Sequence, residues 1–95
     1  MISMEPKHLR IVQLILSQYP YDFYVFGSRA CKEPKPLSDL DLCYLGTMPT
    51  RDLLRLKEQF LDSDLPYKVN LVDWSQCDPY FQDFILKNIA KISCD

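Results

Sequence analysis

Two short apolar runs constrain the fold of this chain more than any other feature of its sequence. The first, residues 23–26, is aromatic and β-branched and stops at Gly27. The second, residues 40–45, is rich in leucine and stops at Gly46. Both runs are typical of β-strands, which favour such side chains and end at turn residues. The sequence therefore predicts two strands joined by the polar, proline-containing connector 32–38.

Helical periodicity predicts two helices, one before these two strands in the sequence and one after them. Residues 6–18 have apolar side chains three and four positions apart, and Pro6 suits the first turn of a helix. Residues 51–61 repeat this spacing, with Thr50 in position to cap the helix. Because an apolar helix face must be buried against another element, we expect both helices to cover the sheet.

The C-terminal third of the chain predicts one more strand, over residues 67–72, and one more helix. This helix is expected to start at Asp78, which precedes a proline, and to continue its apolar side as far as Ile92. The order of elements predicts an α/β (α+β) fold with a small mixed three-stranded sheet covered by helices. We expect residues 1–95 to form a single domain, since two cores would each be too small in a chain of this length.

Composition excludes several classes of function. A formal net charge of -2 argues against nucleic acid as the main partner, because bulk positive charge is missing. No apolar stretch is long enough to span a membrane, the first residues lack the pattern of a signal peptide, and we expect a cytoplasmic location. The four cysteines form no Cys-x-x-Cys pair and are expected to be reduced, small apolar side chains. With His8 as the only histidine, carboxylates are the expected reactive groups.

One segment combines a glycine turn with paired carboxylates: Gly27-Ser28, ten residues, then Asp39-Leu40-Asp41. Residues two apart on a strand project to the same face, so Asp39 and Asp41 are expected to lie side by side, which is costly without a cation between them. Oxygen ligands suit Mg²⁺. Gly27 allows a close approach of the backbone to a ligand, and Ser28 and the amides after it can hold phosphate oxygens. The segment therefore predicts a phosphate cradle beside a metal site.

This pattern resembles the signature of the DNA polymerase beta-like nucleotidyltransferase superfamily, in which glycine-serine is followed by ten residues and by two aspartates one residue apart. All four fixed positions are matched, and residues 64–74 resemble the third-strand segment of the family. Within the superfamily, the chain is similar to the minimal nucleotidyltransferases (MNT) of the antitoxin type. The resemblance implies a nucleotidyltransferase-like fold over most of the chain.

The resemblance also implies transfer of a nucleoside monophosphate from a nucleoside triphosphate, expected to be ATP, to a protein acceptor. Asp39 and Asp41 would be the catalytic and metal-binding residues, with two Mg²⁺ ions. Gly27, Ser28 and Arg29 would bind the nucleotide, with a solvated surface position as the alternative for Arg29. The implied partner is a HEPN-like helical protein, a toxin that this chain would bind or nucleotidylate; self-association into a homo-oligomer is a further possibility.

One position departs from the family pattern. The family carries a third carboxylate on its third strand, where this chain has Asn70. A neutral amide offers a carbonyl oxygen to a metal but no charge, and it cannot act as a base. Asp73 is expected on the opposite face of the strand, where a capping role explains it.

Asn70 therefore leaves two interpretations of the function. The chain is an active nucleotidyltransferase, or it is a weak or inactive nucleotidyltransferase-fold binding module that acts by partner binding alone. A structural alternative for Asn70 is a hydrogen bond within the strand end.

Overall fold

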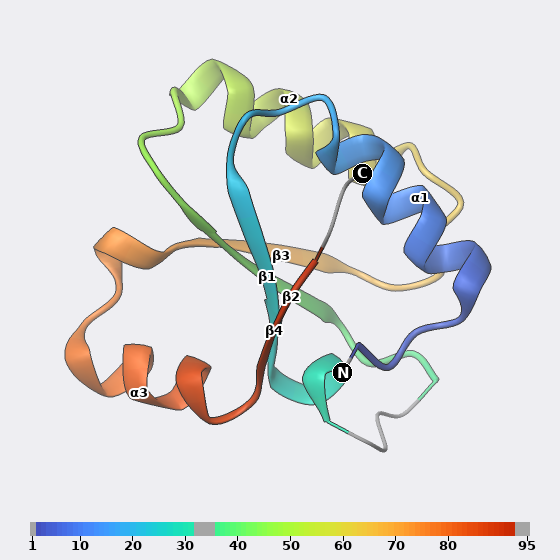
Figure 1. Cartoon of the computed structure of the whole chain (residues 1–95). Helices are drawn as coiled ribbons and strands as arrows, with labels where there is room; N and C mark the ends of the chain where they lie inside the picture. The colour runs from blue at the N-terminus through green and yellow to red at the C-terminus, as the bar shows by residue number, and fades with distance from the viewer. Residues whose placement is uncertain (1, 32–35, 93–95) are drawn as a thin grey trace.

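The computed structural model describes residues 2–31 and 36–92. At its centre is a sheet in the order β3-β2-β1-β4 (Figure 1), made of β1 (Asp22–Phe26), β2 (Leu40–Leu45), β3 (Val69–Asp73) and β4 (Ile89–Lys91). Strand β1 is antiparallel to both β2 and β4, whereas β2 and β3 are parallel. The predicted mixed sheet is confirmed, but the predicted number of strands is wrong, because the sheet has four.

The extra strand replaces the end of the predicted last helix. Helix α3 spans Pro79–Lys87, and Asn88 then leaves the helical conformation with φ -140° and ψ 91°. The chain continues as β4 along β1, and the Ile92 amide donates a hydrogen bond to the Phe23 carbonyl at 3.1 Å. The prediction that the helix continues as far as Ile92 is wrong. Residues 89–91 instead pair with β1, which satisfies the N–H and C=O groups along the edge of that strand, and the spacing of apolar side chains does not report such pairing.

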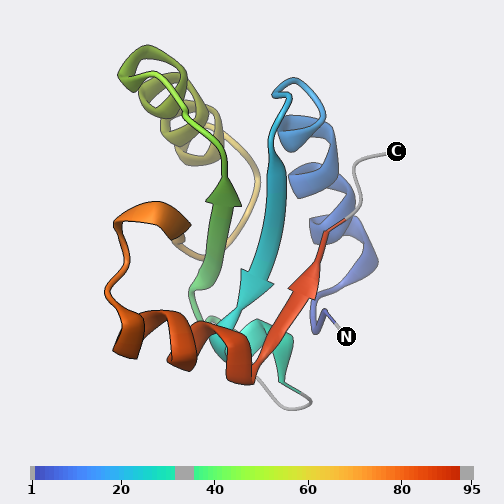
Figure 2. The ribbon, with the colours of Figure 1, turned by 60° about the vertical axis from the view of Figure 1, so that its left-hand side comes forward.

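Helices α1 (Pro6–Leu16) and α2 (Thr50–Leu61) cover one face of the sheet, and α3 lies against the other (Figure 2). The buried side chains of β1 and β2 on the α1 and α2 side alternate along each strand, as strand geometry requires. They are Phe23, Val25, Leu40, Leu42 and Tyr44, and they pack with Val12, Ile15, Leu16, Leu56 and Phe60 of the two helices.

Of the two predicted N-terminal helix caps, the structure has one and lacks the other. The predicted cap at Asp78 is confirmed, because its side chain accepts a hydrogen bond from the Phe81 amide at 2.8 Å. The predicted cap at Thr50 is wrong: Pro49 occupies the cap position, and its carbonyl accepts the first helical hydrogen bond, from Leu53, at 3.1 Å. Helix α2 therefore begins one residue earlier than expected.

Cysteine side chains serve as apolar packing in this fold. The three cysteines among the described residues are free thiols, of which Cys43 is buried on β2. Burial, with smaller contributions from Cys77 and Asp73, raises the pKa of Cys43 to about 11, so the thiol is protonated at neutral pH. None of the described helices is long and apolar enough to span a membrane.

Helix α3 is held to the sheet by one fully buried side chain, Ile85, which packs on Phe26 and Cys43. The neighbouring Leu86 is 56% exposed. We expect Ile85→Ala to lower the free energy of unfolding by about 2–5 kcal/mol, because it leaves a cavity under the helix. The matched control Leu86→Ala should change it by no more than about 0.5 kcal/mol. Urea unfolding of the two variants measures both values, and equal effects would contradict this account of how α3 is anchored.

Candidate functional site

Strand β1 ends in a turn that only glycine accommodates. Gly27 follows β1 directly, has φ +74°, and starts the short 3-10 helix η1 (Gly27–Ala30). A Cβ atom added at Gly27 would lie 2.9 Å from the Asp41 Oδ2 atom. Any other residue would therefore be strained in its backbone and would also displace the carboxylate. The Gly27 backbone thus lies close against Asp41, and its approach to a ligand stays a prediction.

The two predicted carboxylates and Asn70 lie together on the face of the sheet opposite α1 and α2. Asp41 and Asn70 are partners in the parallel register of β2 and β3. The Asn70 Nδ2 group donates hydrogen bonds to Asp39 Oδ2 at 3.2 Å and to Asp41 Oδ1 at 2.9 Å. The amide thus places partial positive charge between two carboxylates that would otherwise repel each other.

Asp73 stands apart from this cluster, as predicted. It pairs in register with Tyr44, so its side chain does not share the face of Asp41. Its Oδ1 atom accepts hydrogen bonds from the Ser75 backbone amide at 2.9 Å and from the Ser75 hydroxyl at 2.8 Å, which caps the 3-10 helix η2 (Trp74–Gln76). The capping role is confirmed, with Ser75 as the partner.

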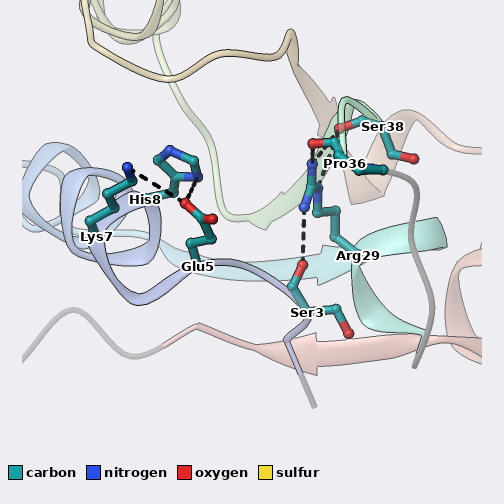
Figure 3. Close-up of polar contacts among 7 residues, drawn as sticks. All are labelled: Ser3, Glu5, Lys7, His8, Arg29, Pro36 and Ser38. Atoms are coloured by element: carbon teal, nitrogen blue, oxygen red, sulfur yellow. Dashed lines mark hydrogen bonds and ion pairs between the residues drawn. The ribbon is translucent and has the colours of Figure 1, made fainter.

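Arg29, which forms no ion pair with Asp39 or Asp41, is buried, with 5% of its surface exposed. Its guanidinium donates four hydrogen bonds to three backbone carbonyls (Figure 3). The Ser38 carbonyl accepts two of them, from Nε at 3.3 Å and from Nη2 at 3.0 Å. The Pro36 carbonyl accepts one at 2.9 Å, and the Ser3 carbonyl accepts one at 3.2 Å. It also lies over the Tyr67 ring, 4.0 Å from the centroid. The solvated alternative for Arg29 is wrong. The predicted phosphate contact finds no support in this geometry, because four hydrogen bonds already engage the guanidinium.

Ser28 occupies the position that the sequence assigned to phosphate binding. It is exposed and follows Gly27 on the same short 3-10 helix. Its hydroxyl is thus accessible to a ligand at this turn.

The side chains of the cluster suit a hard cation. Asp39 and Asp41 supply carboxylate oxygens, and Asn70 has an amide carbonyl that the opposite rotation of its side chain would turn toward them. Mg²⁺ binds through one or two carboxylates and keeps the remaining positions for water and substrate phosphates. No group of three or more histidine, cysteine or acidic side chains with metal-binding spacing occurs within residues 2–31 and 36–92. The donor set therefore fits Mg²⁺ with two charged ligands.

Sequence reasoning missed a pocket that shares only Asn70 with the cluster. It has a volume of about 620 Å³ and lies along β3, with Asn70, Tyr67, Lys57 and Lys68 in its lining. Its size falls within the range of ligand sites. Helix α2 and the edge of β3 form it together, so no local motif could have indicated it.

Comparison with known proteins agrees with this geometry. Residues 11–95 match the family described as Polymerase beta, Nucleotidyltransferase. The chain is 40% identical over 90 residues to the probable protein adenylyltransferase MntA of Haemophilus influenzae, and the match covers 90% of this chain and 79% of the relative.

Two solved structures share the fold. One is a toxin-antitoxin complex with AMP-PNP, with a TM-score of 0.67 and 23% identity, covering 90% of this chain and 72% of that chain. The other is the tri-AMPylated HEPN toxin of Shewanella oneidensis in complex with its MNT antitoxin, with a TM-score of 0.58 and 20% identity, covering 94% and 72%. The family match, the MntA relative and the cluster around Asp39 and Asp41 lead to the same conclusion: the chain belongs to the polymerase beta nucleotidyltransferase family.

Proposed function

We propose that the chain transfers AMP from ATP to a protein acceptor in a metal-dependent reaction that releases pyrophosphate. The observation that carries this proposal is the cluster of Asp39, Asp41 and Asn70, with the bare backbone of Gly27 against Asp41. The identity to MntA, a probable protein adenylyltransferase, supports AMP as the transferred group and a protein as the acceptor.

In this proposal Asp39 and Asp41 hold two Mg²⁺ ions, and Asn70 offers its carbonyl oxygen. The chemistry that bound Mg²⁺ supplies is neutralisation of the triphosphate and stabilisation of charge on the attacking and leaving oxygens of an in-line displacement. The Gly27 turn would approach the phosphates with its backbone, and the exposed Ser28 hydroxyl would hold a phosphate oxygen. Asn70 cannot accept a proton, so within the cluster only the two carboxylates can take one from the acceptor.

We further propose that a HEPN-like helical protein is the partner and the acceptor. The Shewanella oneidensis HEPN toxin is AMPylated and bound to an MNT antitoxin whose fold this chain shares.

A second candidate function rests on Asn70. Its amide bridges both carboxylates by hydrogen bonds and adds no negative charge for a metal. A chain with this cluster can keep the fold and the partner surface while transferring nothing, and would then act by binding alone.

The two functions are separated by a transfer assay. The protein is incubated with the HEPN-like partner from its own genome and with ATP radiolabelled in the α-phosphate. We expect label on the partner in Mg²⁺ and none in EDTA, and we expect Asp41→Asn to reduce transfer by at least about 100-fold. The control Asp73→Asn, on the same sheet but outside the cluster, should keep full activity.

Transfer in EDTA, or undiminished transfer by Asp41→Asn, would contradict the proposal. Partner binding without transfer would favour the second function.

Replacing Asn70 by Asp tests whether the missing charge matters. A third carboxylate should tighten Mg²⁺ binding by about tenfold or more, because charge attracts the ion more strongly than an amide dipole does. Without metal, Asn70→Asp should be less stable than wild type, since the amide bridge is lost and like charges meet. Calorimetric Mg²⁺ titration and melting in EDTA measure the two effects, with Asn70→Ala as the control that removes the bridge without adding charge. Unchanged Mg²⁺ affinity in Asn70→Asp would place residue 70 outside the metal site.

A further inference from the structure

We infer that Arg29 is a positioning residue that fixes the Asp39 carboxylate for metal binding by holding the backbone immediately before it. The inference rests on the proposed function, because Asp39 is one of the two carboxylates assigned to the metal. It gives Arg29 a different role from the phosphate contact that the sequence suggests.

Arg29 holds the carbonyl of Ser38 by a double hydrogen bond. Nε and Nη2 of Arg29 both donate to the Ser38 carbonyl, at 3.3 Å and 3.0 Å. That carbonyl belongs to the peptide plane that Ser38 shares with Asp39. Two donors on this carbonyl therefore fix the orientation of the peptide plane. The Asp39 Cα atom lies in that plane, so its position is fixed as well.

The same side chain contacts the three segments that carry the site. Arg29 follows Gly27 and Ser28, so its own backbone belongs to the glycine turn. Its guanidinium holds the segment before Asp39. Its flat face rests on the Tyr67 ring, three residues before Asn70. One buried group thus links the turn, the first carboxylate and the strand that carries Asn70.

The N-terminal segment closes this arrangement from the other side. The Ser3 amide donates to the Arg29 carbonyl at 2.7 Å. In return, Arg29 Nη1 donates to the Ser3 carbonyl at 3.2 Å (Figure 3). The Ser3 hydroxyl also donates to the Cys31 carbonyl. Arg29 is therefore fixed at both its backbone and its side chain, which a positioning group needs.

The energetics favour a geometric role for this cation. Burying a charge is costly unless it is paired, and no ion pair involves Arg29 in the part of the chain that the structure describes. Charge-assisted hydrogen bonds to carbonyls and the contact with the Tyr67 ring offset that cost. The planar fork of arginine places Nε and Nη2 on the Ser38 carbonyl and Nη1 on the Ser3 carbonyl at once, so lysine, with a single donor nitrogen, would keep the charge and lose the geometry.

Arg29→Lys is therefore the discriminating variant. Mn²⁺ serves as the probe, because carboxylates bind it as they bind Mg²⁺ and its free ion gives an EPR signal that disappears on binding. We expect Arg29→Lys to weaken Mn²⁺ binding by the full-length protein about tenfold, as loss of an orienting group does at metal sites. ATP affinity at saturating Mn²⁺ should stay within about twofold of wild type. The control Arg51→Lys makes the same exchange at an exposed position of α2 and should leave both affinities unchanged.

The outcomes separate this inference from the proposed function. If wild type binds no Mn²⁺, or binds it equally well as Asp39→Asn, the proposed metal site fails, and the positioning role fails with it. If wild type binds Mn²⁺ through Asp39 and Arg29→Lys binds it as tightly, only the positioning role is overturned. A loss of ATP affinity with unchanged Mn²⁺ affinity overturns it as well, because that result indicates a phosphate contact.

A second variant keeps the test decisive if Arg29→Lys does not fold. Tyr67→Leu removes the ring under the guanidinium and leaves the hydrogen bonds of Arg29 in place. We expect it to weaken Mn²⁺ binding by about threefold, a smaller effect than loss of the fork itself. Unchanged Mn²⁺ affinity in a folded Tyr67→Leu would then overturn the positioning role.

Discussion

Two neighbouring carboxylates, Asp39 just before β2 and Asp41 on it, repel each other, and the charge balance of the candidate site depends on how that repulsion is relieved. Asp39 and Asp41 have a hydrogen-bonding amide between them, from Asn70, rather than a third carboxylate. The amide stabilises the pair without metal, and the same amide limits how strongly the pair attracts a cation. We therefore expect the proposed metal binding and transfer to be sensitive to the residue at position 70.

The sheet register brings these groups together. Asp41 pairs with Phe26 of β1 on one side and with Asn70 of β3 on the other, so one row across three strands carries a carboxylate and its amide partner beside the glycine turn. A shift of one residue in either pairing would turn Asp41 toward the core helices. The apolar residues on the other side of β2, Leu40 and Leu42, prevent such a shift because they are fully buried against α1 and α2. The hydrophobic core therefore sets the geometry of the polar site.

Local signals allowed much of the site to be predicted from the sequence. Strand β2 has the expected bounds, Gly27 forms the expected turn, and Asp39, Asp41 and Asn70 share the expected face. These features follow from neighbouring residues and from the two-residue period of a strand. The resemblance to nucleotidyltransferases added the family, which the comparisons confirm.

The features that escaped prediction depend on contacts between distant segments. Strand β4 forms because β1 has an edge with which it can pair. A three-residue strand is too short for its side-chain pattern to be recognised in the sequence. Arg29 is buried because carbonyls of Ser3, Pro36 and Ser38 converge on it, and an arginine in a polar loop is exposed in most chains. The bridging hydrogen bonds of Asn70 required the side-chain geometry of two strands at once.

The central claim is that Asp39 and Asp41 bind a divalent cation which holds a nucleoside triphosphate against the Gly27 turn. Anomalous diffraction from a crystal grown with Mn²⁺ and a non-hydrolysable ATP analogue measures this directly. The account predicts an anomalous peak bonded to both carboxylates, with the triphosphate beside Gly27 and the Asn70 amide no longer donating to the two aspartates. A nucleotide bound elsewhere, or a peak on other side chains with the Asn70 bridge intact, would contradict it.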